Sequence, residues 1–252
     1  MDKESKIKVI ILAAGQGKRM QSKLPKVLIP LRGKPLVAHV LDAVKKSGVG
    51  DTPLVVVGQQ RELIMEKLGS GYKYIIQEEQ LGTGHAVMAA QKALENEAEH
   101  VIVLYGDHPF ISPETIKKLT GKQANSNAKI TMATVNLPDF KDWRVLFYSN
   151  FSRIIRDKNG NIIKDVQFKD ANEEEKKVTE VNPCYFCFEA NWLWKNLKNL
   201  RTDNAQKEYY LTDLVKIAMQ EKIKIESIKI DPREALGANS KEELDILKKM
   251  VL

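Results

Sequence analysis

The sequence predicts an α/β protein with a Rossmann-like, mostly parallel sheet, helices on both faces and an inserted β-hairpin layer. In the first half, apolar strand-like runs alternate with amphipathic helical segments, a pattern typical of a parallel sheet covered on both faces. In the second half, two strand patterns flank Asn159 and Gly160, and both residues tolerate the positive φ of a hairpin turn. The length of 252 residues suffices for one large α/β domain with a sizeable core.

The first half begins with a buried strand that leads into a glycine-rich turn. A helix should follow, because Val37, Val40, Leu41 and Val44 share one helical face and Gly48 is placed to end it. By the same criteria, strands are expected in 7–15, 53–58, 72–77 and 100–107, and helices in 35–48, 61–69 and 85–96.

The second half is more mixed. Ser240 and Glu243 have the spacing of a helix capping box, so a final helix is expected. The run Glu173–Lys177 is interpreted as a solvated loop. Strands are expected in 129–137, twice within 151–168, in 178–189 and in 224–230, and a helix in 208–222. We therefore assign residues 1–239 to one domain and residues 240–252 to a C-terminal helix.

The composition is that of a soluble globular protein. Hydrophobic residues make up 43% and charged residues 29%, and no apolar run approaches the ~18 residues of a membrane span. The polar N-terminus lacks the apolar core of a signal peptide, so a cytoplasmic protein without a membrane partner is expected. The net charge of +7 suits polyanionic ligands such as nucleoside triphosphates. Because the lysines are scattered and no nucleic-acid motif occurs, no nucleic-acid partner is expected.

The two cysteines, Cys184 and Cys187, form a C-x-x-C pair that in other proteins indicates redox chemistry or half of a zinc site. The chain has no second cysteine pair, and its four histidines lie far away in sequence. The flanking residues have a strand pattern, in which positions three apart point to opposite faces. We therefore expect two reduced, buried thiols.

The segment IILAAGQGKRMQSKLPKVL indicates a site for several phosphates. Gly15 and Gly17 allow the backbone to approach a ligand closely, and exposed amides in such a turn form an anion nest. Lys18, Arg19 and Lys26 add positive charge around it. The dinucleotide-binding fingerprint is not met, since Met20 stands where its third glycine belongs, and no Walker sequence follows. The alternative is a glycine turn with surface lysines.

A second segment, QEEQLGTGHA, contains the elements of a base-binding turn. Gln77 closes a strand and offers both a donor and an acceptor to a base edge. The sequence Gly82-Thr83-Gly84 opens a helix and leaves backbone amides free to meet a flat base. Taken alone, this segment is also compatible with an ordinary strand–turn–helix.

Two oxygen-bearing side chains suggest a magnesium site. Asp107 follows a buried strand at the carboxyl edge where α/β proteins bind ligands, and Asn239 in LGANS offers a second oxygen. Mg²⁺ takes few protein ligands and completes its shell with substrate phosphates and water. The alternative for Asp107 is a loop cap such as an Asx turn.

Taken together, the blocks LAAGQGKRM, LPKVL, QLGTGHA, LYGDHP and AQKEYYLTD resemble the uridylyltransferase domain of bacterial UDP-N-acetylglucosamine pyrophosphorylases. The resemblance extends from about Lys8 to Asn239, and Lys18 departs from it, because the family usually has Thr or Ser there. It implies that Arg19 contacts the triphosphate, Lys26 the reacting phosphates, and Asp107 and Asn239 a Mg²⁺ ion.

The resemblance also implies a substrate-binding set, with Gln77 and Gly82 on the uracil and Thr83 and Tyr105 nearby. The catalytic residues are expected to be Arg19, Lys26 and Asp107. The substrate-binding residues are expected to be Leu12, Ala14, Gly15, Gly17, Lys18, Gln77, Gln80, Gly82, Thr83, Tyr105, Ser152, Gln167, Asn182, Glu208 and Tyr210.

The sugar side departs most from the family pattern. Ser152 replaces a glycine, Gln167 replaces a glutamate, and Pro183 and Cys184 follow the retained Asn182. A neutral acceptor at 167 should bind sugar hydroxyls more weakly than a charged one. The insertion DWRVLFYSN, residues 142–150, precedes these changes and is a candidate lid.

The expected reaction transfers a uridylyl group from UTP to a sugar-1-phosphate, with N-acetylglucosamine-1-phosphate favoured, and releases pyrophosphate. The alternatives are another hexose-1-phosphate or another base, and a non-catalytic regulatory protein that binds nucleotide sugars. A monomer or weak homo-oligomer is expected. The resemblance also includes bifunctional relatives, in which a C-terminal β-helix of hexapeptide repeats performs acetyl transfer. No such repeats follow residue 239 in this sequence, so we expect no acetyltransferase activity.

Overall fold

The computed structural model describes residues 6–50 and 52–250. Within them, ten strands form a mixed sheet in the order β5-β4-β1-β6-β11-β7-β10-β8-β9, with β12 also paired to β7. The strands are β1 (Ile7–Ala13), β4 (Leu54–Val57), β5 (Lys73–Ile76), β6 (His100–Tyr105), β7 (Ile130–Asn136), β8 (Ser152–Arg156), β9 (Ile162–Val166), β10 (Glu180–Asn182), β11 (Phe186–Glu189) and β12 (Ile225–Lys229). The short strands β2 (Pro30–Leu31) and β3 (Lys34–Pro35) pair separately.

The helices connect and cover these strands. The α-helices are α1 (Leu36–Ser47), α2 (Arg61–Leu68), α3 (Thr83–Leu94), α4 (Pro113–Ala124), α5 (Leu146–Asn150), α6 (Glu173–Lys177), α7 (Ala190–Leu197), α8 (Asp213–Gln220) and α9 (Lys241–Met250). The 3₁₀ turns are η1 (Lys18–Met20), η2 (Lys26–Leu28), η3 (Asp142–Val145) and η4 (Pro232–Ala235). Strands β5, β4, β1 and β6 are parallel to one another, so the expected parallel half of the sheet is confirmed.

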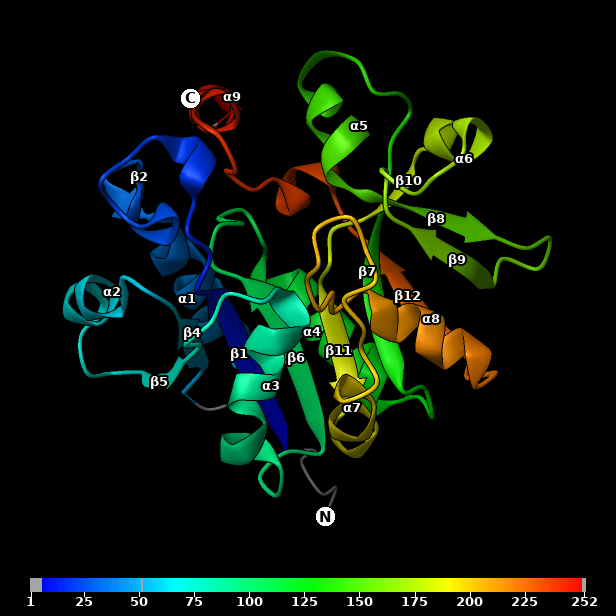
Figure 1. Cartoon of the computed structure of the whole chain (residues 1–252), viewed down its shortest axis with the longest axis horizontal. Helices are drawn as coiled ribbons and strands as arrows, with labels where there is room; N and C mark the ends of the chain where they lie inside the picture. Colours follow the sequence, from blue (N-terminus) through cyan, green and yellow to red (C-terminus); the bar gives the residue numbers. More distant parts are fainter. Residues whose placement is uncertain (1–5, 51, 251–252) are drawn as a thin grey trace.

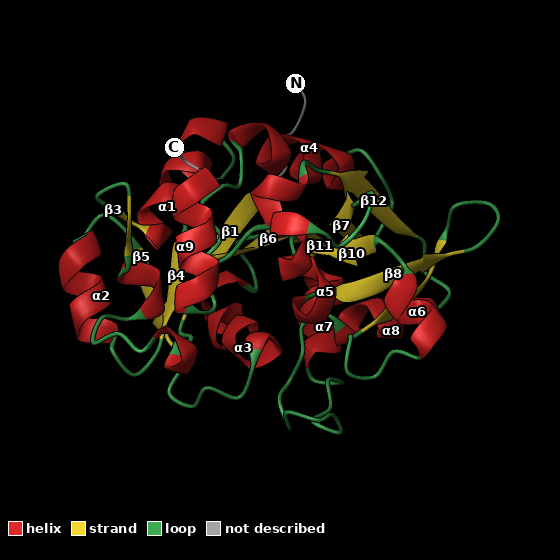
Figure 2. Ribbon diagram, turned by 90° about the horizontal axis from the view of Figure 1, so that it is seen from above, coloured by secondary structure: helices red, strands yellow, loops and turns green. Residues whose placement is uncertain are grey.

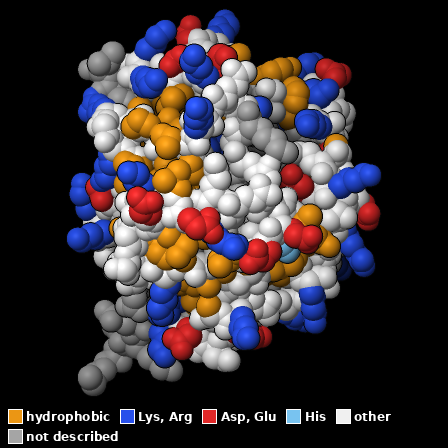
Figure 3. All heavy atoms as spheres, turned by 60° about the vertical axis from the view of Figure 1, so that its left-hand side comes forward, with side chains coloured by type: hydrophobic (Ala, Val, Ile, Leu, Met, Phe, Trp, Pro, Cys, Tyr) orange, Lys and Arg blue, Asp and Glu red, His pale blue; other side chains and the backbone are white. Residues whose placement is uncertain are grey.

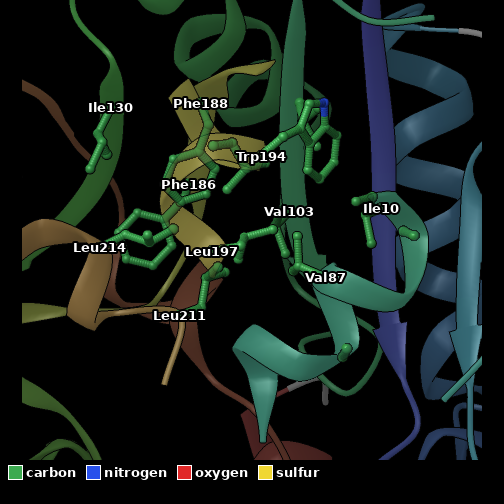
Figure 4. Packing of buried hydrophobic residues seen from close by; sticks show 14 of the residues in the cluster. Ile10, Val87, Val103, Ile130, Phe186, Phe188, Trp194, Leu197, Leu211 and Leu214 are labelled. Atoms are coloured by element: carbon green, nitrogen blue, oxygen red, sulfur yellow. The ribbon is translucent and has the colours of Figure 1, made fainter. Parts of the chain in front are cut away.

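Two apolar layers enclose the sheet. Helices α3, α7 and α8 pack on one face, and α1, α2 and α4 pack on the other, as Figures 1 and 2 show. Figure 4 shows the first layer, in which Val87 of α3, Val103 of β6 and Leu197 of α7 point toward one another. A third cluster joins α5 to α9 through Phe147, Leu244 and Leu247.

Three expectations for the second half need correction. The expected strand 178–189 is broken into β10 and β11, because Cys184 takes a positive φ of 64° and its N–H donates to Asn182 Oδ1 at 2.7 Å. The expected helix 208–222 begins only at Asp213, since Tyr209 instead pairs its backbone with the loop before α3. The expected loop Glu173–Lys177 is helix α6, with Asn172 and Glu175 forming a capping box.

Other expectations hold. The hairpin is β8–β9, attached to the sheet through β10. Both cysteines are free thiols on opposite faces of the sheet, Cys187 in the layer with α1 and α4 and Cys184 against the opposite layer. The expectation that both are buried is correct only for Cys187, because Cys184 is partly exposed. On the face in Figure 3, lysine and arginine side chains are scattered among acidic ones. In the described part of the chain, no helix has the length and apolar character needed to cross a membrane.

Candidate active site

A cavity of about 540 Å³ lies at the carboxyl ends of β1 and β6. These strands run parallel, so Leu12 at the end of β1 and Tyr105 at the end of β6 reach the same edge of the sheet and both line the cavity. The glycine-rich turn after β1 and the loop before α3 supply two of its walls. This edge is where the sequence predicted ligand binding.

The glycine-rich turn closes over Lys26. Gly17 has a φ of 60°, and a Cβ atom added there would lie 2.7 Å from Lys26 Cβ. Only glycine accommodates both the left-handed backbone and this contact without strain. The turn therefore holds the Lys26 side chain at the cavity wall, where it is a lining residue.

Lys26 meets the two oxygen-bearing residues that the sequence proposed for a metal. Its Nζ lies 2.5 Å from Asp107 Oδ2 and donates to Asn239 Oδ1 at 3.2 Å. The Ala238 N–H donates to the Asp107 carbonyl at 3.2 Å, which ties the two loops together. Burial alone would raise the pKa of Asp107, but the Lys26 charge beside it lowers the pKa below its usual value, so the carboxylate stays ionised near neutral pH.

The donor set fits a magnesium ion. The Asp107 carboxylate and the Asn239 amide oxygen converge on one point, where Lys26 Nζ contacts both. Both are hard oxygen ligands, which Mg²⁺ prefers, and it needs only one or two from the protein. Among the described residues, no group of three or more His, Cys, Asp and Glu side chains could hold a metal. The residues present therefore suit Mg²⁺ shared with substrate phosphates better than a site built wholly from protein.

His108 is a lining residue that the sequence analysis did not select. Its ring stacks on Tyr105, and Nδ1 lies 2.9 Å from the Tyr185 hydroxyl, which donates to the Glu234 carbonyl. Burial lowers the pKa of His108, which keeps the ring neutral near pH 7. Its position directly after Asp107 was the one signal in the sequence.

The loop before α3 forms the opposite wall. Gln77 is buried, and its Nε2 donates to the Gly82 carbonyl at 3.1 Å. Gly82 has a φ of 109°, and a Cβ there would lie 2.7 Å from the Tyr209 carbonyl oxygen. The segment around Glu208 thus packs tightly on this loop, and Glu208 itself lines the cavity. Thr83 Oγ1 accepts from the Leu211 N–H at 3.0 Å, which fixes the start of α3.

The predicted nucleotide-side residues mostly come together here. The cavity is lined by Leu12, Ala14, Gly15, Gly17, Lys26, Gln77, Gln80, Gly82, Thr83, Tyr105, Asp107, Glu208 and Asn239. Arg19 instead lines a second cavity of about 410 Å³, together with Gln167 and Tyr210. The Lys18 side chain lies outside what the structure describes, and so do residues 1–5 and 251–252 of the predicted domain and final helix.

Two predicted sugar-side residues are buried away from both cavities. Ser152 is 2% exposed and Asn182 is fully buried, and neither lines a cavity. The Asn182 amide is engaged at both ends, since Nδ2 donates to Asp165 Oδ2 at 2.7 Å and Oδ1 accepts from the Cys184 N–H. Ser152 Oγ and Asp165 Oδ1 are shielded from solvent without a hydrogen-bond partner among the described residues.

Asp165 is a further residue that the sequence analysis missed. Burial raises its pKa to about 6, while the nearby Ser152 and Asn182 side chains oppose the rise and Asp213 adds to it. It lies two positions before Gln167, near the end of β9. The Gln167 side chain donates from Nε2 to Thr212 Oγ1 at 3.1 Å.

The insertion 142–150 forms η3 and α5 and reaches the cleft at its end. Asn150 and Phe151 line both cavities and so separate them. The insertion is anchored by the fully buried Arg153, which donates to the carbonyls of Phe151 at 2.7 Å and Tyr148 at 2.5 Å. Its guanidinium also lies 4.8 Å from the centre of the Phe140 ring. The segment is thus a packed wall of the site.

Comparisons with known proteins identify the family of this chain. Residues 9–210 match the family model described as the MobA-like NTP transferase domain. The bifunctional protein GlmU of Brevibacillus brevis is 41% identical over 241 residues, which cover 95% of this chain and 50% of that protein. The GlmU protein of Desulfotalea psychrophila is 36% identical over 247 residues, covering 97% of this chain and 70% of that protein. The chain therefore spans about half the length of several curated relatives it matches.

Solved structures of lower identity share the fold. A UDP-glucose pyrophosphorylase complexed with UDP-glucose aligns with a TM-score of 0.79 at 16% identity, covering 98% of each chain. A CMP:2-keto-3-deoxy-manno-octonic acid synthetase complexed with CTP aligns with a TM-score of 0.68 at 16% identity, also over 98% of each chain. These similarities confirm the predicted fold of nucleotide-diphospho-sugar transferases.

Proposed function

Because the chain belongs to the family of MobA-like NTP transferase domains, we propose that it transfers a uridylyl group from UTP to a sugar-1-phosphate and releases pyrophosphate. N-acetylglucosamine-1-phosphate is the favoured acceptor, since the resemblance to bacterial uridylyltransferases seen in the sequence blocks is confirmed by the GlmU relatives. One observation supports the reaction class above the others. Lys26, Asp107 and Asn239 converge at the wall of a cavity that also contains the glycine-rich turn.

In the proposed reaction, an oxygen of the sugar phosphate attacks the α-phosphorus of UTP in line with the departing pyrophosphate. One P–O bond forms and one breaks, so the protein supplies neither a nucleophile nor an oxidant. Catalysis then rests on positioning and on stabilising the negative charge that spreads over the phosphates. Lys26 provides the compensating positive charge from a half-buried position beside the glycine-rich turn, where the dielectric screening is weaker than in water.

Asp107 and Asn239 are the residues that would hold Mg²⁺. A bound divalent ion supplies Lewis-acid polarisation of the phosphates and screens the repulsion between the two substrates. The depressed pKa of Asp107 keeps its carboxylate ready to bind a cation at neutral pH. His108, the next residue, stays neutral and stacks on Tyr105.

The uracil is proposed to bind at the wall formed by Gln77 and the loop at Gly82. Gln77 Nε2 already donates to the Gly82 carbonyl, so Oε1 is the group that remains to accept a hydrogen bond from a base. Uracil carries an N3–H donor between two carbonyls, whereas cytosine has an acceptor at N3. A fixed acceptor therefore favours uracil, because the wrong base would leave a buried polar group unpaired.

The test is pyrophosphate release measured for a matrix of triphosphates and sugar phosphates, with and without excess chelator. We expect turnover only with a divalent cation, UTP far better than CTP, and N-acetylglucosamine-1-phosphate at least as good as glucose-1-phosphate. Equal rates with CTP and UTP would refute the base assignment. If no pair of triphosphate and sugar phosphate gave pyrophosphate release, the proposed enzymatic activity would be refuted. The alternative of a non-catalytic regulatory protein that binds nucleotide sugars would then be favoured.

A further inference from the structure

Glu243 of α9 is a buried carboxylate, only 7% exposed. A buried charge is costly unless its oxygens are hydrogen-bonded. Both oxygens of Glu243 have partners, and these come from two different walls of the cleft: Asn239 on one side and Asn150 on the other. Neither contact was foreseen from the capping-box spacing of Ser240 and Glu243.

The first contact fixes the segment that carries Asn239. Glu243 Oε2 accepts from the Asn239 N–H at 2.8 Å, while the Glu243 N–H donates to Ser240 Oγ at 3.3 Å. In the expected capping box the glutamate would return to the N–H of Ser240 itself. Here it reaches one residue further back, so it holds the backbone of the residue whose side chain meets Lys26.

The second contact fixes the end of the insertion. Asn150 Nδ2 donates to Glu243 Oε1 at 3.1 Å and to the Leu146 carbonyl at 3.0 Å. Asn150 lines both cavities, including the one that contains Gln167. Helices α5 and α9 lie at the same end of the sheet in Figure 1, and they share the third apolar cluster.

We propose that Glu243 is a positioning residue that sets the phosphate end and the sugar end of the cleft relative to each other. One carboxylate oxygen holds Asn239, and the other holds Asn150. Helix α9 then helps to position the residues of the site, and it holds the insertion at a fixed distance from the proposed metal ligands. This inference rests on the proposed function for the identity of the two ends.

The alternative is that Glu243 serves only as a helix cap. A cap contributes to stability and leaves ligand affinities alone. A positioning residue changes the affinity for the cation or for the sugar phosphate, at whichever end its contact is lost, even where the fold survives. The two roles therefore differ in what a conservative variant does to binding.

Glu243→Gln is the conservative variant. The amide keeps one acceptor oxygen and replaces the other with a donor. It therefore cannot accept from both Asn239 and Asn150 while Asn150 Nδ2 stays on the Leu146 carbonyl. We expect Mn²⁺ affinity, measured by electron paramagnetic resonance with UTP and without sugar phosphate, to fall or the KM for the sugar phosphate to rise, each by about five- to tenfold where its contact is lost. Asp245→Asn, an exposed carboxylate on the same helix, is the matched control and should change neither.

Rescue separates coupling from general damage. In the Glu243→Gln background, Asn150→Asp offers a carboxylate to the new amide donor while the Gln oxygen still accepts from Asn239. We expect this double variant to recover most of the lost affinity, whereas Asn150→Asp alone places two carboxylates together and lowers both affinity and Tm.

Three outcomes are decisive. Lost affinity in Glu243→Gln with recovery in the double variant supports the proposal. Unchanged Mn²⁺ affinity and unchanged KM in Glu243→Gln, with only a lower Tm, would overturn it in favour of a cap. Failure of the wild-type protein to release pyrophosphate would refute the proposed function instead, and the Tm values of the four proteins would still show whether Glu243 and Asn150 are coupled.

Discussion

The proposed nucleotide side and the proposed sugar side of the cleft differ in how their residues are used. On the nucleotide side, the predicted residues line one cavity and bring Lys26 against Asp107 and Asn239. On the sugar side, Ser152 and Asn182 are buried, and Gln167 lines a separate cavity. A loop that binds phosphates through its backbone tolerates little change in sequence, whereas a pocket built from side chains on an attached hairpin can be rearranged.

The largest expected effect is on the nucleotide side. Lys26→Ala removes the fixed charge at the glycine-rich turn and should lower kcat by about 10²-fold or more, as the loss of one preorganised electrostatic contact typically does. Steady-state pyrophosphate release measures it. Lys23→Ala, an exposed lysine in the same segment, is the control and should retain normal turnover. Normal turnover by Lys26→Ala would remove the basis for assigning the chemistry to this half of the cleft.

A smaller effect is expected from the loop that faces the base. Gly82→Ala forces a side chain into a φ of 109° and places its Cβ 2.7 Å from the Tyr209 carbonyl. The loop must shift, so the KM for UTP should rise about tenfold, which lies within the roughly 1–3 kcal/mol that this backbone region, essentially restricted to glycine, costs an L-residue. Gly71→Ala, in open space with no positive φ, should leave the KM unchanged. If both variants bind UTP like the wild type, the close fit of this wall is unimportant for nucleotide binding.

On the sugar side, the expected effect is on the pH dependence of the free energy of unfolding, and it comes from Asp165. Burial raises the pKa of Asp165 to about 6, from an ordinary value of 3.8. The folded state therefore holds this proton more tightly than the unfolded chain does. The contribution to stability is fully present below about pH 4 and is lost as the pH rises through 6, by about 3 kcal/mol.

Asp165→Asn tests this directly, because the amide oxygen can still accept from Asn182 while the charge is gone. We expect the variant to be more stable than the wild type at pH 8 and the difference to vanish at pH 4, as measured by denaturant unfolding. Glu174→Gln, whose side chain is 83% exposed in α6, should leave the pH profile unchanged. If the free energy of unfolding of the wild type did not change between pH 4 and 7, ionisation of Asp165 would not destabilise the fold.

The sequence predicted the parallel half of the fold and the nucleotide wall because both depend on local patterns. Buried strands, the turn after β1 and the loop before α3 are each set by residues close in sequence. The polar groups that complete the site depend on contacts across long separations. Glu243 and Asn150 are 93 residues apart in the sequence, and Tyr185 and His108 are 77 residues apart. No local sequence pattern therefore predicts either contact.

The break between β10 and β11 is a short-range example of a polar contact that the hydrophobic pattern does not predict. The sequence of 178–189 was interpreted as one unbroken strand. In the structure, however, Asn182 Oδ1 accepts from the Cys184 N–H, and Cys184 has a positive φ. Pro183 between them has no N–H to extend a ladder. A proline with a polar neighbour was therefore the signal that the hydrophobic pattern concealed.

The most direct test of the contrast is one set of specificity constants from one enzyme preparation. The kcat/KM for UTP against CTP, with a single sugar phosphate, reports the nucleotide side. The kcat/KM for N-acetylglucosamine-1-phosphate against glucose-1-phosphate, with UTP, reports the sugar side. We predict a UTP preference that clearly exceeds the preference for the acetylated sugar, because the nucleotide wall retains its pattern and the sugar wall does not. A strict preference for the acetylated sugar together with free exchange of UTP and CTP would contradict the account.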